Sequence, residues 1–418
     1  MRGDRRAGET LYGNRRIETP MNRARTLGLT LTLLLTGTAS SYAQGAQCGG
    51  DFGAFLQGVR QEAVGQGMNP AAVDRAIATM RIDERVLQRD RAQGVFQRPW
   101  LEFMERMITQ NRLDRGRQEL QRNAALFQRI EAETGVPGPV LVAFWGLETD
   151  FGGYLGDFET LPALATLSHD CRRPELFRPH LMAAIQMVDM GLLEPSQMRG
   201  AWAGELGQTQ LLPEDYIRFG TDADGNGRID LIRDSADALF TTAKFIQNMG
   251  WRRGEPWIEE VRLPADFPLE RASVYSREPR SAFAALGVTK ADGSPLETDG
   301  LQASIVMPQG FGGPTFLTFP NFDLYIEWNN SLVYTLSAAY FATRLDGAPR
   351  VSPGNPRPGL NAEQMVQLQR RLQARGHDVG QIDGILGQGT RNAVRAEQIR
   401  LGLPADAWPD ARLLSALN

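Results

Sequence analysis

Residues 140–153 read VLVAFWGLETDFGG, an apolar helical segment with one glutamate, Glu148, near its end. Phe144 lies one helical turn before Glu148 and Leu147 is adjacent to it, so an apolar wall is predicted around the carboxyl. Desolvation disfavours the ionised form and raises the pKa, which suits a general acid near neutral pH. Asp150, two residues on, should point to another side of the helix. The same spacing also fits a polar residue at the end of a core helix that the two glycines terminate.

Composition excludes several kinds of chemistry. The chain has 418 residues, of which 42% are hydrophobic and 22% charged, as in a folded protein of two or three domains. Three histidines and two cysteines exclude a multi-Cys/His zinc site and argue against a Ser-His-Asp or Cys-His centre. A net charge of −4 without a basic stripe argues against a nucleic-acid partner. Any catalysis should therefore depend on carboxylates and hydroxyls.

The first 43 residues have the pattern of a signal peptide. Met21 is the expected initiator, basic residues precede an apolar stretch at 27–35, and Ser41-Tyr42-Ala43 forms a small-x-small cleavage site. The apolar stretch is too short to span a bilayer, so we expect a periplasmic protein without a transmembrane segment. In an oxidising compartment Cys48 and Cys171 can form a disulfide; two buried thiols are the alternative.

Hydrophobic periodicity divides the remaining chain. Helical spacing dominates residues 51–257 and returns at Ser331–Arg344. Between them, a small β-containing insertion (258–320) is predicted from three strand-like runs, Ile258–Leu263, Ala303–Met307 and Thr315–Phe319. A Pro/Gly linker (347–359) then precedes a compact unit at 360–418. The predicted fold class is mainly α, with one large domain at 48–346.

Four segments resemble the B family of bacterial lytic murein transglycosylases: FWGLETDFGGYLGDF (144–158), TLPALATLSHDCRRPELFRPHL (160–181), GAWAGELGQTQLLPEDY (200–216) and NNSLVY (329–334). The resemblance runs from Phe52 to Asp346 and implies a lysozyme-like fold. It implies that Glu148 is the one catalytic carboxylate. The substrate-binding residues that it implies are Gln208, Gln210, Asn329 and Tyr334. Ala201 stands where many members of that family have Ser.

The resemblance also implies a reaction. Glu148 would protonate the oxygen between N-acetylmuramic acid and N-acetylglucosamine in peptidoglycan. It would then remove the proton from the C6 hydroxyl of the muramoyl sugar, which closes a 1,6-anhydro ring without water or a cofactor. A muramidase acting on the same bond is one alternative, and a non-catalytic wall-binding protein is another.

A second constellation matches the first part of an EF-hand calcium loop. Oxygen ligands occupy positions 1, 3, 5 and 9, glycine position 6, while Arg233 replaces the usual glutamate at position 12. The expectation is a weak structural Ca²⁺ site, with an empty Asx-rich turn as the alternative. The four expected ligands are Asp222, Asp224, Asn226 and Asp230.

The unit at 360–418 predicts three short helices around a Gly/Asp loop, IDGILGQGT at 382–390. The pattern is similar to the three-helix peptidoglycan-binding module of many wall enzymes. A dimerisation or stability cap is the alternative, and we expect a monomer that binds peptidoglycan strands.

Overall fold

The computed structural model describes residues 48–91 and 98–418; the predicted signal peptide, with Met21, lies outside them. The described chain is mainly helical, as predicted, with one small sheet between α11 and α13. None of the described helices is long and apolar enough to cross a membrane. The helices that precede the sheet are α1 (Phe52–Gly65), α2 (Pro70–Ile77), α3 (Glu84–Arg91), α4 (Trp100–Met107), α5 (Gln110–Arg122), α6 (Ala124–Thr134), α7 (Gly138–Thr149), α8 (Thr160–His169), α9 (Pro174–Asp189), α10 (Pro213–Phe219) and α11 (Ser235–Asn248).

The sheet has five strands in the order β4-β6-β7-β3-β5, all antiparallel. Its three central strands lie at the three predicted runs, and a separate hydrophobic core packs against them. A second, two-stranded ribbon pairs β1 with β2 in the helical half. The strands and the short helices around them are β1 (Phe158–Glu159), η2 (Pro195–Gln197), β2 (Arg199–Gly200), β3 (Ile258–Arg262), η3 (Leu269–Arg271), β4 (Glu278–Pro279), α12 (Arg280–Ala285), β5 (Thr289–Lys290), β6 (Gln302–Val306) and β7 (Phe316–Thr318).

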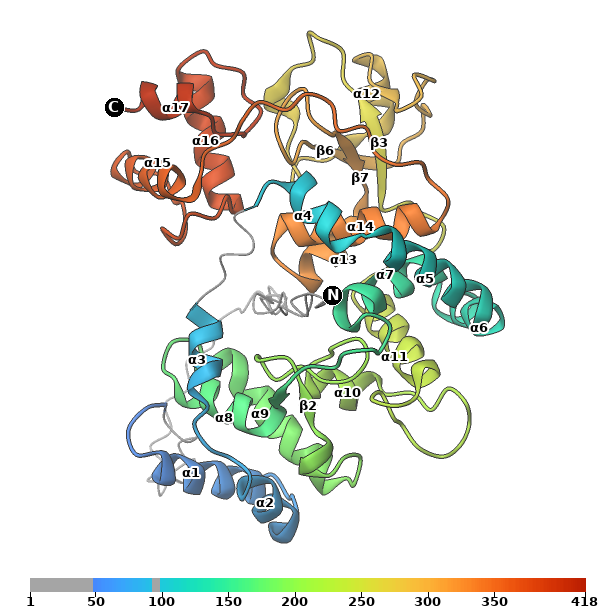
Figure 1. Ribbon diagram of the computed structural model, residues 1–418, viewed down its shortest axis with the longest axis vertical. Coiled ribbons are helices and arrows are strands. Elements are labelled where there is room, and N and C mark those ends of the chain that lie inside the picture. The colour runs from blue at the N-terminus through green and yellow to red at the C-terminus, as the bar shows by residue number, and fades with distance from the viewer. Residues whose placement is uncertain (1–47, 92–97) are drawn as a thin grey trace, which may run out of the picture.

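Helix α7 lies at the centre of the main core. It packs against α5, α6, α11 and α14 (Leu332–Leu345), and eleven of its twelve residues are buried. Figure 1 shows the sheet on one side of α14 and the layer of α1, α2, α8 and α9 at the opposite end of the molecule. Helix α13 (Pro320–Trp328) leads from β7 back toward α7. Because α7 is apolar on every face, it can only be stable inside such a bundle.

The predicted disulfide is present. Cys48 and Cys171, 123 residues apart, are bonded. The segment before α1 is also held by a hydrogen bond from Gly49 N to His169 O at 2.7 Å and by Phe52, whose ring packs edge-on against His169. The start of α1 is thereby attached to the end of α8.

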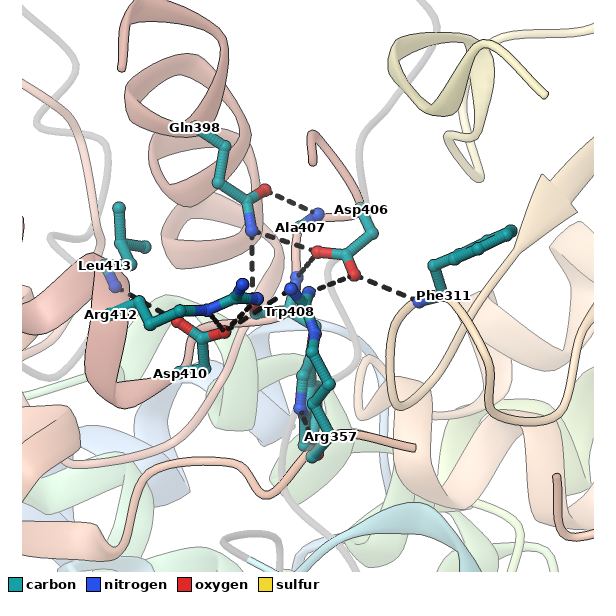
Figure 2. Close-up of polar contacts among 9 residues, drawn as sticks. All are labelled: Phe311, Arg357, Gln398, Asp406, Ala407, Trp408, Asp410, Arg412 and Leu413. Carbon is teal, nitrogen blue, oxygen red and sulfur yellow. Dashed lines mark hydrogen bonds and ion pairs between the residues drawn. The ribbon is translucent and has the colours of Figure 1, made fainter. Parts of the chain in front are cut away.

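The C-terminal helices α15 (Ala362–Ala374), α16 (Gln388–Arg400) and α17 (Ala411–Ala416) form a small core of their own. This unit contacts the loop between β6 and β7 rather than hanging from a free linker (Figures 1 and 2). Asp406 accepts hydrogen bonds from Phe311 N at 3.0 Å and from Gln398, and pairs with Arg357 at 2.5 Å. The chain between α14 and α15 has no helix or strand, but it is attached to the insertion: Asn355 N donates to Gly312 O at 2.7 Å.

Candidate active site

Glu148 is buried, with 6% of its surface exposed. Only one of its two carboxyl oxygens accepts hydrogen bonds from the described residues. Its Oε1 accepts hydrogen bonds from Trp328 Nε1 at 2.7 Å and from the Tyr334 hydroxyl at 2.6 Å. Its Oε2 has no hydrogen-bond partner among the described residues. The carboxyl is therefore oriented through one oxygen, while the other is buried without a hydrogen-bond partner.

The aromatic surroundings of Glu148 come from two helices. Phe144 stacks on Trp328, with ring centroids 4.2 Å apart, and on Tyr325 at 5.0 Å. The residue one turn back in α7 thus contributes by fixing Trp328, the indole that binds Glu148. Stacked rings of this kind hold each other's orientation as well as burying apolar area.

Burial raises the pKa of Glu148 well above its ordinary value, and this is the largest influence on it. The hydrogen bonds from Tyr334 and Trp328 act in the opposite direction, because they favour the carboxylate. The charge of Glu205, itself 5% exposed, raises the pKa further. The net direction agrees with the expectation of a protonated carboxyl near neutral pH.

The end of α7 is shaped by strained backbone rather than by the glycines that were expected to terminate it. The helix ends at Thr149, and Asp150 and Phe151 both adopt positive φ, 51° and 60°. Such a conformation is costly for non-glycine residues and needs support from its surroundings. Two arginines of α5 supply it: Arg115 donates to the Asp150 carboxylate at 2.5 Å, and Arg112 pairs with it at 3.3 Å. Asp150 thus serves the helix terminus, and its partners are these arginines.

The two glutamines implied as cleft residues are buried and bonded to protein groups. Gln208 accepts a hydrogen bond from Trp145 Nε1 at 3.0 Å and donates to Ile232 O at 3.3 Å. Gln210 accepts from Ala201 N at 2.9 Å and donates to Leu155 O at 3.0 Å. Both side chains therefore hold the loop at 200–211 in place: Gln208 connects it to α7 and to Ile232, and Gln210 connects it to Leu155.

The remaining two implied residues lie at the junction of α13 and α14. Asn329 is buried; its side chain accepts from Ser331 N at 2.9 Å and its carbonyl accepts from Thr335 at 2.6 Å. This arrangement sets the start of α14, from which Tyr334 reaches Glu148. Of the four implied substrate-binding residues, the structure brings Tyr334 into contact with the Glu148 carboxyl.

The carboxylates that lie together at the calcium-type loop differ from the four expected ligands. Oxygens of Asp222, Asp224 and Asp237 lie within 4.8 Å of one another. Asp230 is not in this group; its carboxylate pairs with Arg233 at 2.7 Å. Asn226 lies in the loop, where its Nδ2 donates to Asp224 at 2.8 Å. Asp222 and Asp224, on a loop with glycine turns, and Asp237, in the first turn of α11, offer the carboxylate oxygens that a hard cation such as Ca²⁺ prefers.

Sequence reasoning missed three residues of these sites: Trp328, Glu205 and Asp237. Trp328 is 180 residues from Glu148, and nothing in its local spacing distinguishes it from a core tryptophan. Glu205 stands in an otherwise apolar and glycine-rich stretch, AWAGELG, and that isolation was the available signal. Asp237 lies in the first turn of α11, three residues after the N-cap Asp234, where acidic residues are favourable in any helix, so its position alone does not indicate a metal site.

Comparison with known families shows the class of protein to which this fold and carboxyl site belong. Residues 51–343 match the family described as Transglycosylase SLT domain, and residues 361–417 match a family of peptidoglycan binding domains. The chain belongs to the SLT transglycosylase family. The resemblance to lytic murein transglycosylases of the B family is confirmed.

Three relatives are informative. SltB3 from Pseudomonas aeruginosa, solved with NAG-anhNAM-pentapeptide and with NAG-NAM-pentapeptide, is 36% identical, with a TM-score of 0.82 over 88% of this chain and 100% of that one. The Escherichia coli lytic transglycosylase Slt35, solved with calcium, is 26% identical, with a TM-score of 0.61 over 72% and 96%. Membrane-bound lytic murein transglycosylase B of Escherichia coli (strain K12) is 27% identical over 239 residues, which are 57% of this chain and 65% of that protein.

Proposed function

We propose that this protein is a peptidoglycan lytic transglycosylase that cleaves the bond between N-acetylmuramic acid and N-acetylglucosamine. The observation that carries the proposal is the Glu148 carboxyl: buried, with its pKa raised, held through Oε1 and without a hydrogen-bond partner at its buried Oε2. The relatives support the substrate, since SltB3 binds muropeptides with and without the anhydro ring.

One carboxyl serves both halves of the reaction. Protonated Glu148 donates its proton to the glycosidic oxygen as the bond to the muramoyl anomeric carbon breaks. The carboxylate left behind accepts the proton of the muramoyl C6 hydroxyl, whose oxygen bonds to the anomeric carbon and closes the 1,6-anhydro ring. Trp328 and Tyr334 stabilise the carboxylate between the two steps, because both donate to it.

Glu205 is the observation that favours the hydrolytic alternative. Ordinary glycosidases use two carboxyl groups, and Glu205 is a second buried carboxyl that influences the pKa of Glu148. If Glu205 activated a water molecule, Glu205→Gln would abolish turnover as completely as loss of Glu148. We expect instead that Glu205→Gln keeps turnover and changes only its pH dependence.

Mass spectrometry of digested peptidoglycan tests the reaction. We expect anhydro-muropeptides; products one water heavier, which acquire ¹⁸O from labelled water, would establish a muramidase. The variant Glu148→Gln should form soluble products about 10²–10⁴-fold more slowly while still binding insoluble peptidoglycan. Retained turnover in this variant would contradict the proposed role, and a wild-type protein that binds but releases nothing would leave a wall-binding function only.

Export, domain boundaries and calcium belong to the same proposal. Residues 1–43 act as a periplasmic signal peptide, and residues 48–346 form the catalytic domain. Residues 347–359 connect it to the wall-binding domain at 360–418, and the protein is a monomer.

A structural Ca²⁺ binds between the calcium-type loop and α11, through Asp222, Asp224 and Asp237, with Asn226 beside them. The calcium complex of Slt35 supports this assignment. No cofactor takes part in the chemistry.

A further inference from the structure

A hollow of about 310 Å³ lies beside the short ribbon of β1 and β2, and the mechanism above makes no use of it. Three segments line it: the loop after α7 at 155–156, the stretch from 193 to 199 that includes η2, and the end of the calcium-type loop at 230–233. This volume is at the lower end for ligand pockets, so a compact group such as one or two amino-acid residues fits it.

The inner wall is apolar and firmly placed. Leu155, Leu193 and Ile232 line the hollow, and Leu193 is 4% exposed. Gly156 has φ of 108°, and a Cβ there would lie 2.1 Å from Gly200 O, so the loop is pressed directly against β2. Leu155 is further held through its carbonyl by Gln210 at 3.0 Å. The hollow therefore has a wall that exists before any ligand binds.

The rim carries positive charge. Arg199 donates to Asp157 O at 3.3 Å, and among the described residues no carboxylate forms an ion pair with its guanidinium. Arg233 pairs with Asp230 through Nε at 2.7 Å and is 69% exposed, so its terminal nitrogens face solvent. The local balance of Arg199, Arg233 and Asp230 is one positive charge, on a chain whose net charge is −4.

Two neutral donors complete the lining. The Gln197 side-chain oxygen accepts from Glu194 N at 2.9 Å, which leaves its amide NH₂ to donate, and Ser196 adds a hydroxyl. An apolar wall with a guanidinium and neutral donors matches a group that has one carboxylate and a small aliphatic substituent. A planar guanidinium can bind both oxygens of a carboxylate at once, which a neutral sugar cannot reproduce.

We propose that this hollow binds the carboxylate end of a short peptide, of the kind that stems carry in peptidoglycan, with Arg199 as the carboxylate ligand. This inference rests on the proposed function, because the peptide would come from the peptidoglycan substrate. Leu155 is seven residues beyond Glu148, on the loop that leaves the catalytic helix. The hollow would thus make the enzyme sensitive to the peptides attached to a glycan strand.

Calorimetric titration of the full-length protein tests the site directly. The probe is N-acetyl-D-alanyl-D-alanine, compared with the same peptide carrying a C-terminal amide. We expect the amide to bind at least tenfold more weakly, and Arg199→Gln to weaken binding of the carboxylate form about tenfold. Arg199→Lys should restore part of the affinity. Arg262→Gln, a change at an exposed arginine of β3, is the matched control and should bind like the wild type.

Kinetics then separates this site from the catalytic proposal. On soluble glycan strands that retain their peptides, Arg199→Gln should raise KM several-fold without changing kcat; on strands stripped of peptides by an amidase, it should match the wild type. Equal binding of the two probes, or an equal KM change on both substrates, would overturn the peptide site while anhydro products uphold the reaction. If no anhydro products form at all, the reaction fails, and the titration still decides the site.

Discussion

The burial of Glu148 disfavours its ionised form and raises its pKa. A carboxyl whose pKa is raised in the folded protein contributes stability that is fully present below the unfolded pKa, about 4.3, and is lost as the pH rises toward the folded pKa. We therefore expect Glu148→Gln to be more stable than the wild type by about 1 kcal/mol at neutral pH. Thermal unfolding from pH 4 to pH 9 should show this difference growing with pH; a constant difference would contradict the buried, protonated state.

Glu205 and Tyr334 influence the pKa of Glu148 in opposite directions. Removal of the Glu205 charge by Glu205→Gln should lower this pKa, because the two carboxylates repel each other. Loss of the Tyr334 hydroxyl in Tyr334→Phe should raise it, because that hydroxyl stabilises the carboxylate.

The alkaline limb of the pH–rate profile reports this pKa. It should move to lower pH in Glu205→Gln and to higher pH in Tyr334→Phe, each relative to the wild type. Shifts of the same sign in both variants would show that they act by distorting the site instead.

At the scale of the element, the calcium-type loop is connected to α7, the helix that carries Glu148. Gln208 N donates to Leu231 O at 2.8 Å, near the end of the loop, and its side chain accepts a hydrogen bond from Trp145 of α7. Thr149, next to Glu148, donates to Gln208 O at 2.6 Å. Through Gln208, these hydrogen bonds connect the calcium-type loop to the end of α7 that carries Glu148.

Metal removal tests this element. Calcium at 100 times its Kd should stabilise the protein by about 2.7 kcal/mol, so a chelator should lower Tm. Asp237→Asn should weaken calcium binding strongly because Asp237 belongs to the carboxylate group, whereas Asp230→Asn should have a smaller effect because Asp230 pairs with Arg233. The reverse order in calcium titrations would restore the ligand set expected from the sequence.

At the scale of the whole molecule, the wall-binding unit is attached through buried charge. Arg391 of α16 donates to Pro308 O at 2.9 Å, Arg395 donates to Ala272 O, and burial lowers the pKa of Arg391 to about 10. The Asp406 carboxylate is the nearby negative charge, and it also pairs with Arg357 (Figure 2).

Asp406→Asn should therefore destabilise the protein by about 3 kcal/mol, because it leaves partly buried arginines without their counter-charge. Chemical denaturation measures this, and Asp378→Asn, at an exposed aspartate of the same unit, is the control. An unchanged midpoint in Asp406→Asn would mean that the unit is not fixed to the sheet by these contacts.

The disulfide joins two positions that are far apart in the sequence. It closes a loop with a sequence separation of 123 residues, for which the chain-entropy estimate is about 5 kcal/mol. The double variant Cys48→Ser/Cys171→Ser should lower Tm, and reducing agent should lower the wild-type Tm toward the same value. If reducing agent changes the variant as much as the wild type, the stabilisation has another origin.

Local pattern was sufficient for much of this protein. The apolar run before Glu148 determines a buried helix, and the three strand-like runs determine the central strands of the sheet. These features depend on spacing within a few residues, because helix and strand periodicity and capping are short-range effects. The raised pKa of Glu148 follows in direction from its apolar neighbours for the same reason.

Tertiary structure alone decided which groups meet that carboxyl. Trp328 and Tyr334 reach it from 180 and 186 residues away, Asp237 replaces Asp230 beside Asp222, and the extended linker is fixed between sheet and wall-binding unit. Such contacts arise from the packing of whole elements, and packing leaves no periodic signature in the chain. The sequence determined that a carboxyl would be buried; the fold decided which of its oxygens accepts the two hydrogen bonds that orient it.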